Sequence, residues 1–183
     1  MELTNLAIQG LGLVAMAFNT LSYQRKNRTT VIAMQLVGTF LFSIHFYLLD
    51  ATMGCILNAL SAVRAVIFLN KEKLHADRPV WLAGFTAVYI ASYVLTFTLF
   101  GTAATLKNLV LEVLPLIGMV AITISFRLSD AKAIRKFALI SSPCWLIYNI
   151  ANMSIGAILC EVLSLGSILI GIFRLDRTAP KPQ

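Results

Sequence analysis

Long apolar runs recur along this 183-residue chain, and they constrain its fold more than any other feature. A helix that crosses a bilayer needs about 20 mainly apolar residues, whereas barrel strands need about ten and alternate in polarity. Polar breaks divide the sequence into seven long runs: 4–22, 30–49, 52–69, 79–100, 103–126, 134–151 and 155–173. We therefore expect an all-α polytopic membrane protein, with seven transmembrane helices in a single integral membrane domain over 1–183.

The composition excludes an ordinary soluble domain. Charged residues make up 13% of the chain and hydrophobic residues 58%, whereas soluble domains carry about 25% charge. The net charge of +7 does not indicate nucleic acid, because the basic residues cluster in short loops between apolar runs. We expect the lipid bilayer to be the partner and no nucleic acid to bind, and a homo-oligomer stays open.

The basic clusters also predict an orientation. With seven spans, the first, third and fifth loops and the C-terminal tail share one side, and they hold thirteen of the fifteen basic residues: Arg25, Lys26, Arg28, Lys71, Lys73, Arg78, Arg127, Lys132, Arg135, Lys136, Arg174, Arg177 and Lys181. Positive loops stay in the cytoplasm. We expect a multi-pass protein of the bacterial inner membrane with its N-terminus outside and its C-terminus cytoplasmic.

The cysteines and the N-terminus point to no special chemistry. Cys55, Cys144 and Cys160 lie within apolar runs and show neither a CxxC nor a Cys/His metal spacing. We predict no disulfide, no metal and no cofactor. The first run follows an acidic start and precedes no cleavage pattern, which favours a retained helix over a signal peptide.

The two ends of the chain resemble each other. GLVAMAF (12–18) parallels GMVAITI (118–124), and IHFYLLDATMGCILNALS (44–61) parallels IYNIANMSIGAILCEVLS (147–164). An unpaired helix between two triplets lets both triplets run in the same direction. We therefore predict a 3+1+3 parallel triple-helix repeat: a first repeat at 4–70, a linker helix at 79–100, a second repeat at 103–174 and a tail at 175–183.

Four stretches carry a resemblance to a known family: IHFYLLD (44–50), ILNALSAVR (56–64), EVLPLIG (112–118) and CWLIYNIANMSIGAILCE (144–161). Over nearly its whole length the chain resembles the YgjV-type bacterial inner-membrane proteins, which implies an inner-membrane location. More distantly it resembles the SWEET and PQ-loop transporters, which share the 3+1+3 plan and imply transport.

The match to SWEET and PQ-loop proteins is incomplete. Ser22, Tyr23 and Gln24 stand where a PQ-loop protein has its Pro-Gln pair, and helix prolines occur only in the second repeat. The resemblance places Asn58 at a binding-site asparagine, but the repeat counterpart of Asn58 is the acidic Glu161. This weakens the case for a neutral-sugar facilitator.

A central pocket is the predicted solute site. His45 and Asn58 flank the Asp50 turn and are thirteen residues apart, as are their repeat counterparts Tyr148 and Glu161. At 1.5 Å per residue each lies roughly 8–10 Å below the outer surface. These residues either line a pocket, to which Trp145 and Asn149 are added, or only make hydrogen bonds between helices.

Other polar residues within the runs are candidates for a coupling or solute pathway. Charges within a span cost at least ~2.5–3.5 kcal/mol at the helix centre and usually face a cavity or a partner. The pathway candidates are Glu112, Glu161, Arg64, Gln35 and Asn19. Arg64 is placed to extend its side chain to the cytoplasmic surface or to pair with Glu112, and Pro115 and Pro143 are candidate hinges.

The function expected from these features is a small transporter or facilitator of a sugar-like or amino-acid-like solute, working by alternating access between the two triplets. The alternative is a non-transporting sensor or accessory subunit whose polar residues serve helix contacts. No nucleophile–base pair or phosphate loop is present, so we predict no catalytic residues and no enzyme.

Overall fold

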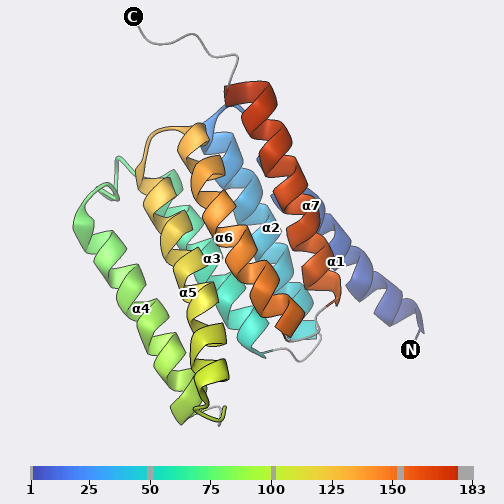
Figure 1. Ribbon diagram of the computed structural model, residues 1–183. Coiled ribbons are helices and arrows are strands. Elements are labelled where there is room, and N and C mark those ends of the chain that lie inside the picture. The colour runs from blue at the N-terminus through green and yellow to red at the C-terminus, as the bar shows by residue number, and fades with distance from the viewer. Residues whose placement is uncertain (1, 49–51, 100–101, 152–154, 177–183) are drawn as a thin grey trace, which may run out of the picture.

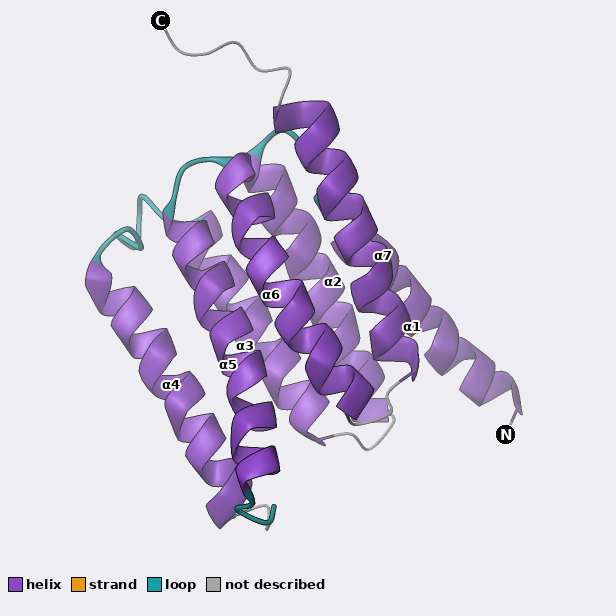
Figure 2. Cartoon of the chain, viewed as in Figure 1, coloured by secondary structure: helices purple, strands orange, loops and turns teal. Residues whose placement is uncertain are grey.

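The computed structural model describes residues 2–48, 52–99, 102–151 and 155–176 (Figure 1). Within these ranges the chain is helical and contains no strand (Figure 2). The helices are α1 (Glu2–Ser22), α2 (Arg28–Leu48), α3 (Thr52–Leu69), α4 (Pro79–Thr98), α5 (Leu106–Arg127), α6 (Ala131–Ala151), α7 (Ile155–Gly171) and the π-helical segment η1 (Ile172–Asp176). The predicted all-α class is confirmed, and each predicted run coincides with one helix to within about three residues at either end.

Local sequence explains where several helices begin. The side chains of Asn27, Thr105 and Asp130 each accept a hydrogen bond from a backbone N–H in the helical turn that follows, at 2.8, 3.3 and 3.0 Å. Such caps satisfy donors that the first turn leaves unpaired. Pro79 opens α4, where the missing N–H of proline costs no hydrogen bond.

The helices pack as two sets of three with one helix at the edge. In the first set α2 lies between α1 and α3, and in the second α6 lies between α5 and α7. The helix α4 packs mainly against α5, at one edge of the bundle (Figure 1). Among the described residues, the more extensive contacts between the sets are those of α1 with α7, α2 with α6, and α3 with α5.

Four described helices are long and apolar enough to cross a membrane: Arg28–Leu48, Pro79–Thr98, Leu106–Arg127 and Ala157–Asp176; the stretches Ala7–Ser22 and Cys55–Leu69 are apolar but shorter. The helix α6 is more polar and buries Arg135, Ser141, Ser142 and Asn149. Because α2, α5 and α7 all contact α6, these groups face protein, where polar residues in a span are tolerated.

The tightest packing lies near one end of the bundle. We call this the basic end, because it carries the loops 23–27, 70–78 and 128–130, which are rich in Lys and Arg. The aromatic ring of Phe68 lies 6.3 Å from the ring of Phe85 and 5.9 Å from that of Phe126. Side chains from the first turns of α2 and α6 complete this core. The helices are therefore held together most firmly at the basic end.

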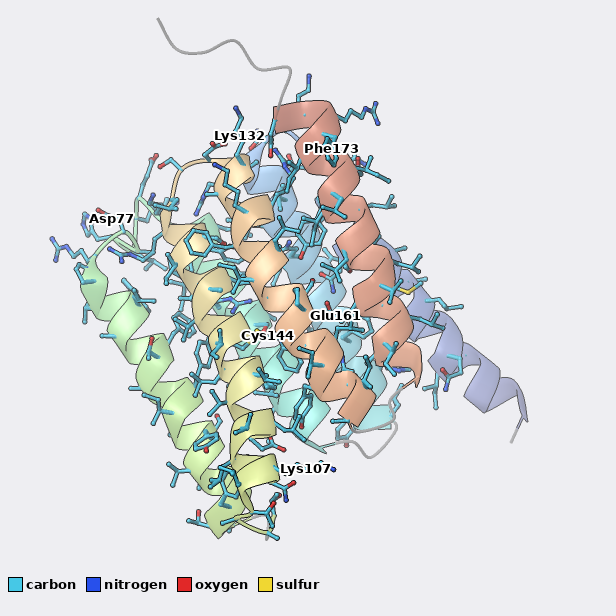
Figure 3. All side chains as sticks on the ribbon, in the orientation of Figure 1. Asp77, Lys107, Lys132, Cys144, Glu161 and Phe173 are labelled. Carbon is cyan, nitrogen blue, oxygen red and sulfur yellow. The ribbon has the colours of Figure 1, made fainter. Side chains whose placement is uncertain are left out.

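The outer surface of the bundle is apolar. Side chains project outward from all around the bundle (Figure 3). The large exposed apolar ones include Leu13, Phe40, Val63, Val88, Ile140 and Leu163. Soluble monomers rarely expose so much contiguous apolar surface. A lipid environment accounts for this surface.

Candidate functional site

A cavity of about 260 Å³ lies where α3, α4, α5 and α6 meet, and we call it the α4–α5 cavity. Its wall is formed by Leu57, Tyr89, Ser92, Tyr93, Thr96, Thr102, Glu112, Pro115, Leu116, Met119 and Tyr148. Six of these residues carry a hydroxyl group and one, Glu112, is charged. The lining is thus much more polar than the outer surface of the helices around it.

Glu112 and Tyr148 form the polar centre of the cavity wall. The Tyr148 hydroxyl donates a hydrogen bond to the Glu112 carboxylate and so joins α5 to α6. Glu112 lies six residues from the start of α5, which places it about 9 Å along the helix. The predicted pathway residue Glu112 and the predicted binding residue Tyr148 therefore meet in one site.

Pro115 contributes to the same wall. It is buried one turn after Glu112 in α5. A proline within a helix removes one backbone hydrogen bond and tends to bend the helix, and here the carbonyl left without that bond is that of Leu111. The candidate hinge thus lies directly beside the charged residue of the cavity.

The side chain of Arg64 turns inward, so the expectation that it extends to the cytoplasmic surface is wrong. It is only 5% exposed, and its guanidinium donates to the Tyr89 hydroxyl and the Met119 carbonyl, both at 3.3 Å. It also lies over the Phe126 ring, 5.2 Å from the centroid, an arrangement that stabilises a cation. These neighbours hold the group away from the basic end.

Arg64 and Glu112 do not form the ion pair that was considered as an alternative. Among the described residues, the side-chain ion pair in the structure is Arg135–Asp176. Arg64 lies instead behind Tyr89 and Met119, which also line the cavity. The cavity wall therefore contains the acidic Glu112, and the basic Arg64 lies on the other side of two wall residues.

His45 makes contacts within the first set of helices. Its Nδ1 lies 2.9 Å from the Ile8 carbonyl oxygen, and its ring packs against Gly12, where an added Cβ would come within 2.9 Å. This contact joins α1 to α2. Asp50, which was expected to form the neighbouring turn, lies outside the described residues.

The remaining predicted binding residues lie elsewhere in the helix contacts. The Glu161 carboxyl bonds the Ser142 hydroxyl and so joins α7 to α6. Trp145 packs against Gly118, Asn149 is buried in α6, and Asn58 is partly buried in α3. Of the six predicted binding residues, Tyr148 alone lines the α4–α5 cavity.

The weaker pathway candidates pack between helices. Gln35 donates to the Ser22 hydroxyl at 3.2 Å, and Asn19 packs against Gly38, so both connect α1 with α2. Pro143 lies partly buried within α6. None of the three lines the α4–α5 cavity.

Four cavity residues of α4 were not predicted, because 79–100 was treated as a linker helix. They are Tyr89, Ser92, Tyr93 and Thr96. Their spacing of three, four and seven residues puts them on one face of a helix. A polar face on an otherwise apolar helix was the signal available in the sequence.

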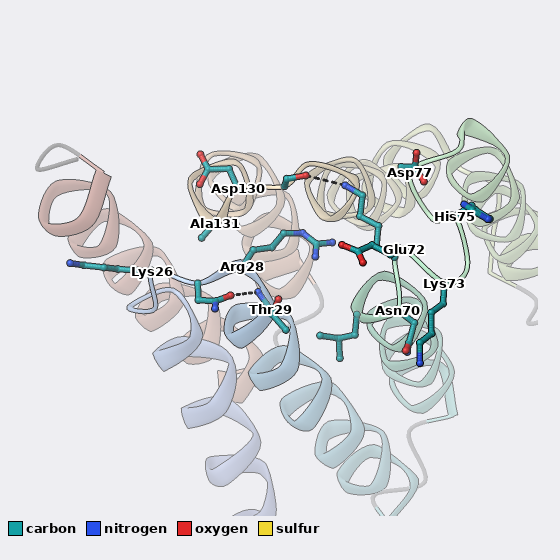
Figure 4. Close-up of a pocket in the computed structure, with 14 residues that line it drawn as sticks. Lys26, Arg28, Thr29, Asn70, Glu72, Lys73, His75, Asp77, Asp130 and Ala131 are labelled. Carbon is teal, nitrogen blue, oxygen red and sulfur yellow. Dashed lines mark hydrogen bonds between the residues drawn. The ribbon is translucent and has the colours of Figure 1, made fainter. Parts of the chain in front are cut away.

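A second, larger depression of about 1010 Å³ opens at the basic end (Figure 4). It is lined by Lys26, Asn27, Arg28, Thr29, Leu69, Asn70, Lys71, Glu72, Lys73, His75, Asp77, Ser129, Asp130 and Ala131. Lys71 bonds the Arg127 carbonyl, and Arg127 in turn donates to the Asp77 carbonyl at 2.7 Å. These basic groups therefore bind carbonyl oxygens of neighbouring loops and helix ends.

Two arginines tie the two sets of helices together at this end. Arg28 of α2 donates to the carbonyls of Phe68 (3.2 Å), Phe126 and Leu128 (2.8 Å). These oxygens lie at the ends of α3 and α5, where helices leave carbonyls unpaired and favour positive charge. Arg28 thus closes the gap between the first set and the second.

Arg135 of α6, in the second set, bonds the segment that follows α1 of the first set. It donates to the carbonyls of Tyr23 (3.3 Å) and Arg25 (2.8 Å), just after α1, and forms a bidentate ion pair with Asp176 in η1. Gly171 brings α7 so close that an added Cβ would lie 2.5 Å from the Tyr23 carbonyl oxygen. The end of α1 is therefore locked to the end of α7.

Within the described residues, no group of three or more His, Cys, Asp or Glu is arranged to hold a metal ion. Cys55, Cys144 and Cys160 are free thiols and partly buried.

Comparison with known proteins places the chain in a family. No curated protein matches it, and no solved structure matches it. The family model Imp-YgjV, described as a bacterial inner membrane protein, matches residues 6–179. This match confirms the resemblance carried by the four stretches quoted above, and it agrees with the apolar surface of the helices. The chain belongs to the Imp-YgjV family of bacterial inner membrane proteins.

Proposed function

We propose that this protein transports a small polar solute across the bacterial inner membrane and that the α4–α5 cavity is its solute site. The observation that carries the proposal is Glu112, a carboxyl group in the wall of a hydroxyl-lined cavity within apolar helices. A charge inside a span costs at least ~2.5 kcal/mol, and such residues generally face a cavity or a partner. Tyr148 supplies one hydrogen bond to the Glu112 carboxylate, and a solute that enters the cavity would satisfy the acceptors that remain.

Transport of this kind needs two units that move against each other, and we propose a 3+1+3 repeat as the architecture. The two sets of helices have the same internal order, and the contacts α1–α7 and α5–α3 are the two that a pseudo-twofold rotation would exchange. Gly12 and Gly118, which correspond in the repeat, both lie against a ring from the middle helix of their set, His45 and Trp145 respectively. These parallels support the repeat beyond its low sequence identity.

The arginine contacts support alternating access between the two sets. Arg28 bonds the end of α5 and Arg135 the segment after α1, which are corresponding helices in the proposed repeat. Each arginine thus lies on a middle helix and reaches the first helix of the other set. In this conformation these contacts hold the two sets together at the basic end, and α1 diverges from α7 towards its N-terminus (Figure 1). Release of both contacts would open the basic end.

The proposed orientation puts the basic end in the cytoplasm, the N-terminus outside and the C-terminus inside. Thirteen of the fifteen basic residues lie in the loops and the tail assigned to that side, in accordance with the positive-inside rule. In this orientation Arg28 and Arg135 join the two sets on the cytoplasmic side.

Uptake into liposomes that contain the purified protein tests the proposal. Sugars, amino acids and amines are supplied outside, and wild type is compared with Glu112→Gln and with Glu72→Gln, which makes the same charge change in an exposed loop. We expect uptake of at least one solute class to be lost in Glu112→Gln and kept in Glu72→Gln. Uptake by both variants at the wild-type rate would contradict the assignment of the cavity.

A non-transporting accessory subunit is the second candidate, and the contacts of His45 and Gln35 favour it. Both residues bond neighbouring helices of the first set and so have packing roles. In that case the α4–α5 cavity would be closed to water. The introduced thiol of Tyr93→Cys would then not react with water-soluble thiol reagents. If the cavity is part of a transport pathway, this thiol should react with them.

A further inference from the structure

We infer that the α4–α5 cavity binds a small organic cation through a primary ammonium group. This inference rests on the proposed function only in taking the same cavity as the solute site. The polar atoms that the cavity offers to a ligand come from one carboxylate and six hydroxyl groups. The positions of the hydroxyl hydrogens decide which ligand these atoms suit.

The hydroxyl hydrogens of α4 are already used by the protein. Ser92 donates to the Val88 carbonyl at 3.0 Å, and Thr96 donates to the Ser92 carbonyl at 3.0 Å. Tyr93 donates to the Leu109 carbonyl of α5 at 3.3 Å. What these three groups leave for a ligand is oxygen lone pairs, which only accept hydrogen bonds.

The hydroxyl hydrogens of Tyr148 and Tyr89 are also donated to groups of the protein. The Tyr148 hydroxyl donates to Glu112. Thr123 donates its own hydrogen to the Met119 carbonyl at 2.7 Å, so in the 3.2 Å contact between Tyr89 and Thr123 the tyrosine is the donor. Five of the six hydroxyl groups therefore use their hydrogens within the protein, and the Tyr89 oxygen also accepts a hydrogen bond from Arg64. The wall offers a ligand mainly acceptors, to which the carboxylate adds two oxygens.

A primary ammonium group is the complement of such a wall. It carries three donors and no acceptor, and its charge matches a carboxylate that no described Lys, Arg or His pairs with. Lys107, the nearest base along α5, is exposed, and Arg64 donates to other groups. The ammonium would supply the missing countercharge of Glu112.

The tyrosine rings of the wall also suit the ammonium charge and the alkyl part of such a ligand. Tyr89, Tyr93 and Tyr148 all line the cavity. The faces of aromatic rings attract cations, and the rings also provide apolar surface for alkyl groups. At about 30 Å³ for each water-sized group, the cavity of about 260 Å³ holds roughly eight non-hydrogen atoms. A short alkylamine or an amine-bearing solute of that size fits.

Three molecules of nearly equal size but different charge test whether the cavity selects a cation. Calorimetric titration of the purified protein in detergent compares n-butylammonium, 1-butanol and butyrate. We expect n-butylammonium to bind at least about tenfold more tightly than the other two, because it alone brings a positive charge to the Glu112 carboxylate along with its N–H donors. Equal binding of all three, or a preference for butyrate, would overturn the inference.

The variants use Glu72→Gln as the matched control. We expect the preference for n-butylammonium to disappear in Glu112→Gln and to persist in Glu72→Gln; persistence in both would overturn the inference. A comparison on wild type alone does not depend on how the variants fold. There, n-butyltrimethylammonium, which has the charge but no N–H donor, should bind about tenfold more weakly than n-butylammonium, and equal affinity would refute the primary-ammonium assignment.

The two proposals fail separately. Binding of n-butylammonium without uptake of any solute into liposomes would refute transport and leave the cation site intact. Uptake of a neutral solute by a protein that does not bind n-butylammonium would refute the cation site and leave transport intact.

Discussion

Arg135 of α6 and Asp176 of η1 form a bidentate ion pair in which both side chains are nearly inaccessible, with exposures of 2% and 9%. Arg135 also bonds two carbonyls after α1, so three segments far apart in the sequence meet at one guanidinium. A buried ion pair costs desolvation, and removal of one partner leaves the other charge uncompensated. This group is therefore well placed to hold the basic end closed.

Asp176→Asn should loosen the basic end. The substitution removes the carboxylate but not the shape, and it leaves the Arg135 charge without its counterion. We expect a loss of stability of roughly 3 kcal/mol, the lower range for broken buried pairs, measured as a lower midpoint of thermal unfolding in detergent. Asp77→Asn is the control, because the Asp77 side chain is exposed and only its backbone carbonyl accepts bonds. Equal midpoints for the two variants would show that the pair contributes nothing to closure.

Gly171→Ala should be among the most damaging single-methyl additions in the protein. The new Cβ would lie 2.5 Å from the Tyr23 carbonyl oxygen, which is backbone and cannot rotate away. Overpacking of this kind costs about 1–3 kcal/mol, so we expect a lower unfolding midpoint.

Gly166→Ala in the same helix is the matched control for Gly171→Ala. Nothing lies within 4 Å of a Cβ at position 166, and alanine is favoured over glycine within a helix by roughly 0.5–1 kcal/mol. We expect Gly166→Ala to be neutral or stabilising. Destabilisation of both variants to the same extent would mean that the α1–α7 contact is not the cause.

The helices could be predicted from the sequence because the signals that define them are local. Apolar run length and the capping residues Asn27, Thr105 and Asp130 act within a few positions of each helix end. The family, too, was indicated by short stretches, and the profile match confirms it. The predicted orientation and the repeat stay predictions.

The site was predicted only in part, because residue depth does not reveal which face of a helix a residue occupies. Glu112 and Tyr148 were singled out separately, but their contact depends on how α5 turns against α6. Arg64 was expected at the surface from its distance to the helix end, whereas acceptors on α4 and α5 draw it inward. Such contacts depend on tertiary packing, which residue spacing does not encode.

Arg64→Met should separate stability from function. Arg64 is buried, its Nε has no hydrogen-bond partner, and its other bonds go to neutral acceptors. A buried charge without a counterion carries a desolvation cost, and an apolar side chain of similar length removes that cost. We expect an unchanged or higher unfolding midpoint together with a loss of solute uptake, because Tyr89 in the cavity wall loses the group that orients it. A lower midpoint would identify Arg64 as a structural residue.

Thiol labelling should show that the two ends of the bundle differ in access to water. In a variant without the native cysteines, Thr96→Cys in the cavity wall should react with a membrane-impermeant maleimide added from outside. Ala138→Cys, at a fully buried position of the basic-end core, should stay unreactive from either side. His75→Cys in the exposed α3–α4 loop should react only from the cytoplasmic side and so reports orientation.

If the two arginines hold the basic end closed, then adding Asp176→Asn should raise the reactivity at position 138 from the cytoplasmic side and lower it at position 96 from outside. Labelling at both positions that does not respond to Asp176→Asn would mean that the bundle has one state and would rule out alternating access.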